Sequence, residues 1–63
     1  MFDFLFELTK YSDNEGEKIL CEAPNLDTAY TYLTELYGFE HNELCFIEKM
    51  SVVEGEMLGL DTY

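Results

Sequence analysis

The first part of the chain alternates apolar and polar residues, a pattern typical of β-strands. In residues 2–9 the large apolar side chains fall at every second position: Phe2, Phe4, Phe6 and Leu8. This period of two predicts a half-buried strand. Residues 17–23 repeat it, with Ile19, Cys21 and Ala23 on one face. Residues 12–16 between them are turn-forming and end in Gly16, so we expect an antiparallel hairpin.

Residues 25–38 carry clear helix signals. Pro24 ends the second strand because proline has no backbone N–H to donate, and Asn25 is a favourable N-cap. Gly38 suits the left-handed position that ends many helices. Between these signals, apolar residues recur at helical spacing: Leu26, Ala29, Tyr30, Leu33, Leu36 and Tyr37.

A third strand is predicted for residues 44–50. Leu44 and Phe46 share one face and Cys45 and Ile47 the other, which indicates a central strand or an interface. Residues 51–63 contain apolar residues and glycines without a regular pattern, so their structure is left open. The order β-β-α-β predicts a single α+β domain spanning residues 1–63, with one helix packed on an antiparallel sheet.

The charge of the chain indicates what kind of partner it could bind. Fourteen acidic residues stand against three lysines and no arginine, giving a net charge of −11, yet 48% of the residues are hydrophobic. This apolar content is high enough that we expect the chain to fold. The charge opposes folding, because the acidic side chains repel one another in the compact state. Protein grooves that hold DNA are lined with lysine and arginine, so an acidic protein can occupy such a groove in place of DNA. Alternatively, the acidity only maintains solubility.

The small size of the chain calls for an additional source of stability. A core of 63 residues rarely supplies more than about 3–5 kcal/mol. Cys21 and Cys45 lie in strand-like runs and do not form a disulfide framework. A homodimer is therefore the simplest stabiliser. Without a recognisable signal peptide or membrane-length apolar run, we expect a cytoplasmic protein. Its charge predicts no direct binding to nucleic acid or membranes.

No motif for catalysis, cofactors or metals stands out. No serine or cysteine is placed beside His41 in a recognisable nucleophile motif. The two cysteines and the histidine lack the spacing of a zinc site. Residues 13–17 combine carboxylates with a glycine but lack the length of a calcium-binding loop. The sequence predicts a non-enzymatic protein that binds neither a cofactor nor a metal.

Three segments carry a resemblance to a known family. They are Asp-Asn-Glu-Gly-Glu-Lys at residues 13–18, Leu-Tyr-Gly at 36–38 and Asn-Glu-Leu at 42–44. With these segments, the chain from about Phe4 to Val52 resembles the small phage-encoded inhibitors of uracil-DNA glycosylase, which are dimeric DNA mimics with a ββαβ fold. The resemblance implies a homodimer that acts in the host bacterial cell. It would occupy the DNA-binding groove of the glycosylase and block uracil excision.

The resemblance also implies site residues. In the family, an apolar helix side chain plugs the pocket from which the enzyme intrudes into DNA. Its phenylalanine aligns with Leu33 and its tyrosine with Tyr37, while its glutamate falls on Thr34, a departure that Glu35 could offset. Tyr30 and Tyr32 are alternative plugs. The acidic surface that would mimic DNA is expected to include Asp13, Glu15, Glu17, Glu22 and Glu35.

Other interpretations stay open at the level of sequence. The stripe of Tyr30, Leu33 and Tyr37 also fits core packing or a dimer seam. The same mimicry could be directed at another DNA-binding enzyme, in an anti-CRISPR or anti-restriction role, because all such enzymes have basic grooves. A third possibility is an acidic phage structural or interaction protein that inhibits nothing.

Overall fold

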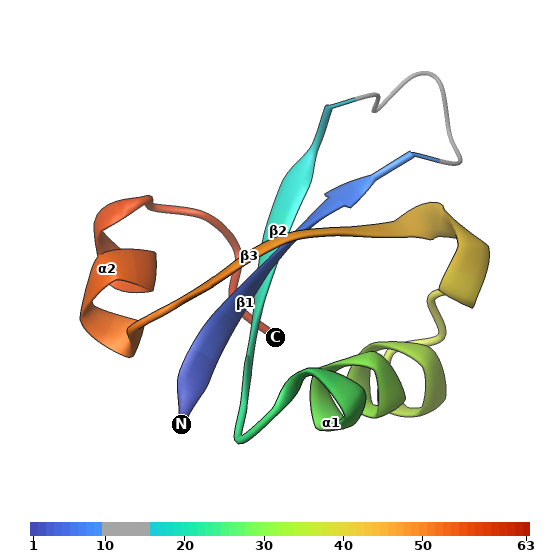
Figure 1. Ribbon diagram of the computed structural model, residues 1–63. Coiled ribbons are helices and arrows are strands. Elements are labelled where there is room, and N and C mark those ends of the chain that lie inside the picture. The colour runs from blue at the N-terminus through green and yellow to red at the C-terminus, as the bar shows by residue number, and fades with distance from the viewer. Residues whose placement is uncertain (10–15) are drawn as a thin grey trace.

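Three antiparallel strands form the centre of the molecule. A computed structural model describes residues 1–9 and 16–63, and its strands are β1 (Phe2–Leu8), β2 (Lys18–Ala23) and β3 (Leu44–Met50), in the order β2-β1-β3. Figure 1 shows a helix on either side of this sheet. The predicted α+β class and β-β-α-β order are confirmed. The expectation of a single helix missed α2 (Val52–Met57).

The hairpin of β1 and β2 forms as predicted. Its strands pair from Phe2 opposite Ala23 to Glu7 opposite Lys18. Most of the predicted turn lies outside the described residues, but Gly16 is described and has a φ of 86°. This left-handed backbone favours glycine.

Strand β3 is an edge strand, so the expectation that it could be central was wrong. It pairs with β1, and the register shifts so that Leu5 lies opposite Glu48 while Phe6 lies opposite Phe46. Ile47 is therefore the extra residue of a β-bulge, which reverses the faces of the strand. Before the bulge Phe46 faces the main core, and after it Glu48 faces the opposite side together with Leu5. Met50, opposite Asp3, thereby faces the α2 side, whereas Leu44 and Phe46 face the main core.

The main helix is capped as predicted but changes its winding. The backbone N–H of Thr28 donates to Asn25 Oδ1 at 2.8 Å, which makes Asn25 the N-cap of α1 (Leu26–Thr31). Gly38 ends the helical segment with a φ of 79°. Between them, the last turn is a π-helix, η2 (Tyr32–Leu36). A π-turn contains more residues than an α-turn, so it moves Leu36 off the core stripe.

Helix α1 and the sheet enclose the main core. Its fully buried members come from both strands of the hairpin and from the helix: Phe4, Phe6, Ile19, Cys21, Ala23, Ala29 and Leu33. Beyond Phe39, the 3-10 turn η3 (His41–Glu43) leads into β3. Glu43 is buried there because its carboxylate accepts the backbone N–H of Glu40 at 2.7 Å.

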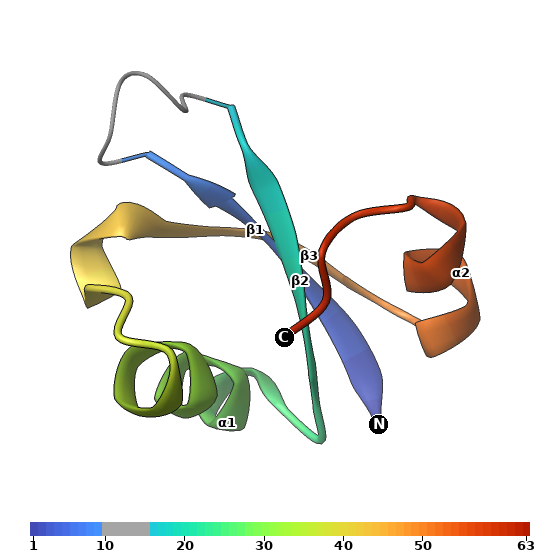
Figure 2. The same ribbon diagram turned by 180° about the vertical axis from the view of Figure 1, so that it is seen from behind.

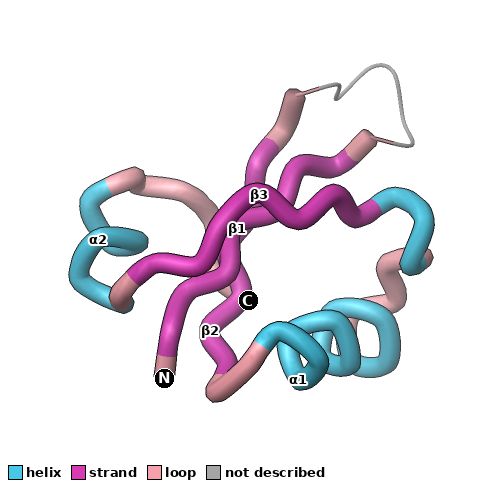
Figure 3. The backbone as a smooth tube through the Cα atoms, viewed as in Figure 1, coloured by secondary structure: helices cyan, strands magenta, loops and turns pink. Residues whose placement is uncertain are grey.

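The C-terminal residues cover part of the second face of the sheet and the outer edge of β2. Ser51 caps α2 through a capping box with Glu54, and α2 lies on the side of the sheet opposite α1 (Figure 3). Residues 61–63 then follow the outer edge of β2 (Figure 2). Leu20 N–H donates to the carbonyl of Asp61 at 2.9 Å, and Tyr63 N–H donates to the carbonyl of Leu20 at 2.7 Å. Because of this coverage, the middle of β1 is buried on both faces and not half-buried as predicted.

Candidate protein-binding surfaces

Most of the acidic side chains lie on the surface. The exposed ones come from β2, β3, both helical segments and the loops: Glu17, Glu22, Asp27, Glu35, Glu40, Glu48, Glu54, Glu56 and Asp61. The predicted residues Glu17, Glu22 and Glu35 are therefore accessible to a partner. Asp13 and Glu15 lie outside the described residues. Three lysines are too few to neutralise this surface, so it presents a strong negative field.

The α2 side of the sheet holds a buried carboxyl. Asp3 is 1% exposed, and its Oδ1 has no hydrogen-bond partner among the described residues. Burial raises the pKa of this carboxyl, and repulsion from Glu22 and Glu56 raises it further. These shifts follow from the cost of ionising a desolvated group near like charges.

Helix α2 approaches Asp3 at a glycine. A Cβ on Gly55 would lie 2.9 Å from Asp3 Cβ and still closer to the carboxylate. Such contacts are too short for any side chain, so glycine permits the helix to pack here. A six-residue helix is not stable alone, and its position depends on this contact with the sheet.

The candidate plug aligned by the resemblance belongs to the core. Leu33 is 0% exposed and packs between α1 and the sheet, so in this conformation it cannot enter a pocket of another protein. Tyr30 is half-buried, with its ring 5.2 Å from Phe6 and stacked on His41 at 4.6 Å. Tyr32 is likewise half-buried against the core.

Two residues at the end of η2 are accessible instead. Tyr37 is 52% exposed, and its ring meets the edge of the Tyr63 ring at 5.0 Å. Leu36 is 70% exposed and was not among the sequence candidates, because the helical spacing assigned it to the core. Together with Glu35, these residues form an exposed apolar and acidic corner, which we call the η2 tip.

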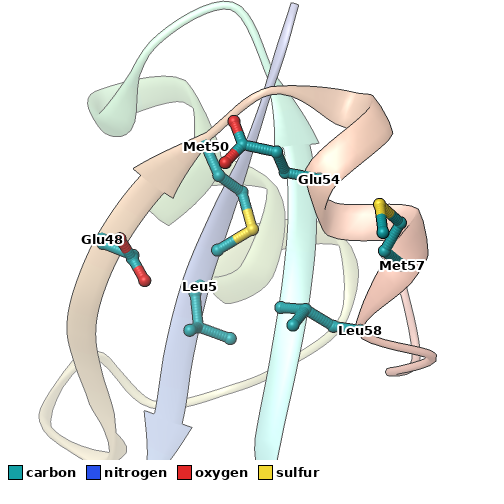
Figure 4. A pocket seen from close by; sticks show the side chains of 6 residues that line it. All are labelled: Leu5, Glu48, Met50, Glu54, Met57 and Leu58. Carbon is teal, nitrogen blue, oxygen red and sulfur yellow. The ribbon is translucent and has the colours of Figure 1, made fainter.

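A second accessible apolar surface lies beside α2. A pocket of about 340 Å³ is lined by Leu5, Glu48, Met50, Glu54, Met57 and Leu58 (Figure 4). Met57 is 82% exposed at its margin. We call this feature the α2 pocket. Exposed apolar side chains grouped in this way mark interaction sites in many soluble proteins.

The described residues do not form a metal site. Between residues 1–9 and 16–63, no three histidine, cysteine, aspartate or glutamate side chains converge as metal ligands. Both cysteines are free thiols, with Cys21 buried and Cys45 exposed. The imidazole of His41 stacks on Tyr30. A negative field with two exposed apolar surfaces is suited to contact with a basic protein.

Comparisons with known proteins provide no evidence for or against a protein-binding role. No protein family, curated protein or solved structure matches the chain. The relationship to the glycosylase inhibitors therefore stays a prediction. In the part of the chain that the structure describes, no helix is both long and apolar enough to cross a membrane.

Proposed function

We propose that this protein is a DNA-mimicking inhibitor that occupies the DNA-binding groove of a uracil-DNA glycosylase and blocks uracil excision. The observation that carries the proposal is the distribution of its carboxylates. Although the fold buries Asp3 and Glu43, it leaves nine other acidic side chains exposed among the described residues. A groove that binds the phosphates of DNA with lysine and arginine is complementary to such a surface.

Inhibition would begin with electrostatic attraction. The field of many carboxylates steers a protein toward a basic groove and raises the association rate. Exposed charges are screened over a Debye length of about 8–10 Å at ordinary ionic strength. Binding should therefore depend on the sum of the carboxylates and weaken as salt is added.

The η2 tip is the best candidate for the apolar anchor. Binding energy in protein interfaces is concentrated in a few side chains that become fully buried. Leu36 and Tyr37 can be buried by a partner without disturbing the core, whereas Leu33 cannot. Glu35 adds a carboxylate beside them. The plug role that the resemblance assigns to Leu33 is accordingly moved to Leu36, with Tyr37 beside it.

A homodimer remains part of the proposal. The helix stripe is largely occupied by core packing, which leaves the edge strand β3 as the candidate interface. Its bulged residue Ile47 is 41% exposed, and no described strand pairs with its outer edge. Analytical ultracentrifugation at micromolar concentration tests the homodimer. A sedimentation profile of monomer alone would refute it.

The proposed function is tested by a pull-down and an activity assay. The purified protein should retain a uracil-DNA glycosylase from bacterial lysate and slow excision of uracil by that enzyme at equimolar amounts. Recovery of another DNA-binding enzyme would redirect the proposal to anti-CRISPR or anti-restriction activity. Recovery of no basic protein would favour a structural role, and unchanged uracil excision would refute the glycosylase as target.

A further inference from the structure

The α2 pocket combines an apolar floor with two carboxylates. Leu5 and Met50 form the floor on the sheet, and Met57 and Leu58 border it from the helix. In the view of Figure 4, the Met50 side chain lies between Glu48 of β3 and Glu54 of α2. Methionine side chains are flexible and polarisable, so they adapt to the shape of an incoming group.

Both carboxylates can accept further hydrogen bonds. Glu54 Oε1 accepts the backbone N–H and the hydroxyl of Ser51, at 3.3 and 3.0 Å. A carboxylate has about four acceptor positions, so capacity remains on Glu54. Glu48 is exposed at the edge of the sheet. Lys49 does not serve this pocket, because it lies on the other face of the sheet with its Nζ 4.5 Å from the centre of the Phe2 ring.

The chemistry of the pocket disfavours occupants that lack positive charge. A second copy of this chain has no arginine and only three lysines, so even in a β3 dimer it offers this pocket few cationic side chains. A neutral apolar group would desolvate Glu48 and Glu54 without giving them a partner, which is unfavourable. A side chain with an aliphatic stem and a cationic head satisfies both parts of the site.

We infer that the α2 pocket receives an arginine side chain of the partner protein. The stem would lie over Leu5 and Met50, and the guanidinium would donate to Glu48, while Glu54 adds negative charge to the same pocket. Arginine fits better than lysine because its planar head is weakly hydrated and donates in a fork that matches carboxylates. This inference rests on the proposed function for the identity of the partner, since DNA-binding grooves are rich in arginine.

A methyl NMR titration of the full chain with N-acetyl-arginine amide tests the site without any glycosylase. We expect saturable shifts of the Met50, Met57 and Leu58 methyl signals, with a dissociation constant on the order of 1 mM for so small a ligand. The neutral analogue N-acetyl-norleucine amide should bind more weakly. Glu48→Gln should weaken arginine binding about two- to fivefold, as expected for a partly exposed ion pair.

Glu35→Gln is the matched control, because it removes the same charge from the distant η2 tip and should leave the titration unchanged. The inference is overturned if the pocket methyls do not shift, if norleucine amide binds equally well, or if Glu35→Gln weakens binding as much as Glu48→Gln. Such a result would leave the glycosylase proposal standing, since no enzyme takes part. Conversely, if the protein failed to inhibit uracil excision, arginine binding measured in this titration would still stand.

Discussion

The two sides of the sheet differ in what they bury. On the α1 side, the alternate residues Phe4 and Phe6 of β1 join Leu33 in an apolar core with almost no exposed surface. On the α2 side, Asp3 of the same strand is buried without a partner for Oδ1 among the described residues, while Met57 remains exposed. Strand β1 therefore contributes apolar side chains to the core on one face and a buried, destabilising carboxyl on the other. The α1 side therefore stabilises the fold, and under the proposed function the α2 side retains charge for a partner.

The largest expected effect comes from the α1 core. Leu33→Ala should destabilise the protein by about 2–5 kcal/mol, because it removes a fully buried side chain and leaves a cavity. Urea unfolding followed by circular dichroism measures the change. Met57→Ala on the other side is the control and should stay within about 0.5 kcal/mol of the parent chain. Equal effects of the two variants would show that both sides of the sheet contribute alike to stability.

The η2 tip should separate binding from stability. Leu36→Ala should cost about 2 kcal/mol of binding to the glycosylase, mainly as faster dissociation, and should leave the fold intact. Surface plasmon resonance at fixed salt measures dissociation, and circular dichroism monitors folding. Thr31→Ala, an exposed change on the preceding helix, is a control for changes on this segment. An unchanged dissociation rate for both Leu36→Ala and Tyr37→Ala would exclude the tip as the anchor.

The contact between α2 and the sheet should be sensitive to a single methyl group. Gly55→Ala should destabilise the protein by about 1–3 kcal/mol, because the added Cβ overlaps Asp3. Hydrogen exchange should show that α2 loses protection before the sheet does. Val53→Ala on the same helix removes exposed apolar surface and should change little. Undiminished protection of α2 in Gly55→Ala would show that the close approach is not required.

Asp3 should make stability fall as pH rises. Its folded pKa is raised above the ordinary value of 3.8, so the folded state holds this proton more tightly than the unfolded chain. The cost of ionising it is absent below 3.8 and grows as pH rises through the folded pKa. Asp3→Asn should therefore be more stable than the parent at neutral pH, by about 1–3 kcal/mol, and this gain should shrink in acid. A gain that does not vary between pH 3 and pH 7 would contradict a buried, titrating Asp3.

The elements on the α1 side could be predicted because their signals are local. Asn25 and Gly38 mark the ends of the helical segment by their own backbone and side-chain preferences. The π-turn that exposes Leu36 has no such signal, and the helical spacing predicted that Leu36 would continue the core stripe. Leu33 was a binding candidate through the family alignment alone, while its spacing also fitted the core, where the structure places it.

The α2 side was less predictable because it depends on contacts between distant residues. Ser51 and Glu54 form a capping box, but a six-residue helix with an internal glycine is weak without tertiary packing. Its position follows from Gly55 meeting Asp3, which are far apart in the chain. The bulge at Ile47 is likewise a property of strand pairing. The α2 pocket depends on both features, so no local pattern could predict it.

Titrating uracil excision with this protein at low and at high salt tests DNA mimicry itself. A DNA mimic should abolish excision near equimolar amounts at low salt and lose potency steeply as salt rises, because its carboxylates are screened. Replacing Glu17, Glu22, Glu35 and Glu48 together by glutamine should reproduce that loss at low salt in a protein that still folds. Inhibition that is absent, or that is insensitive to both salt and the four substitutions, would contradict DNA mimicry.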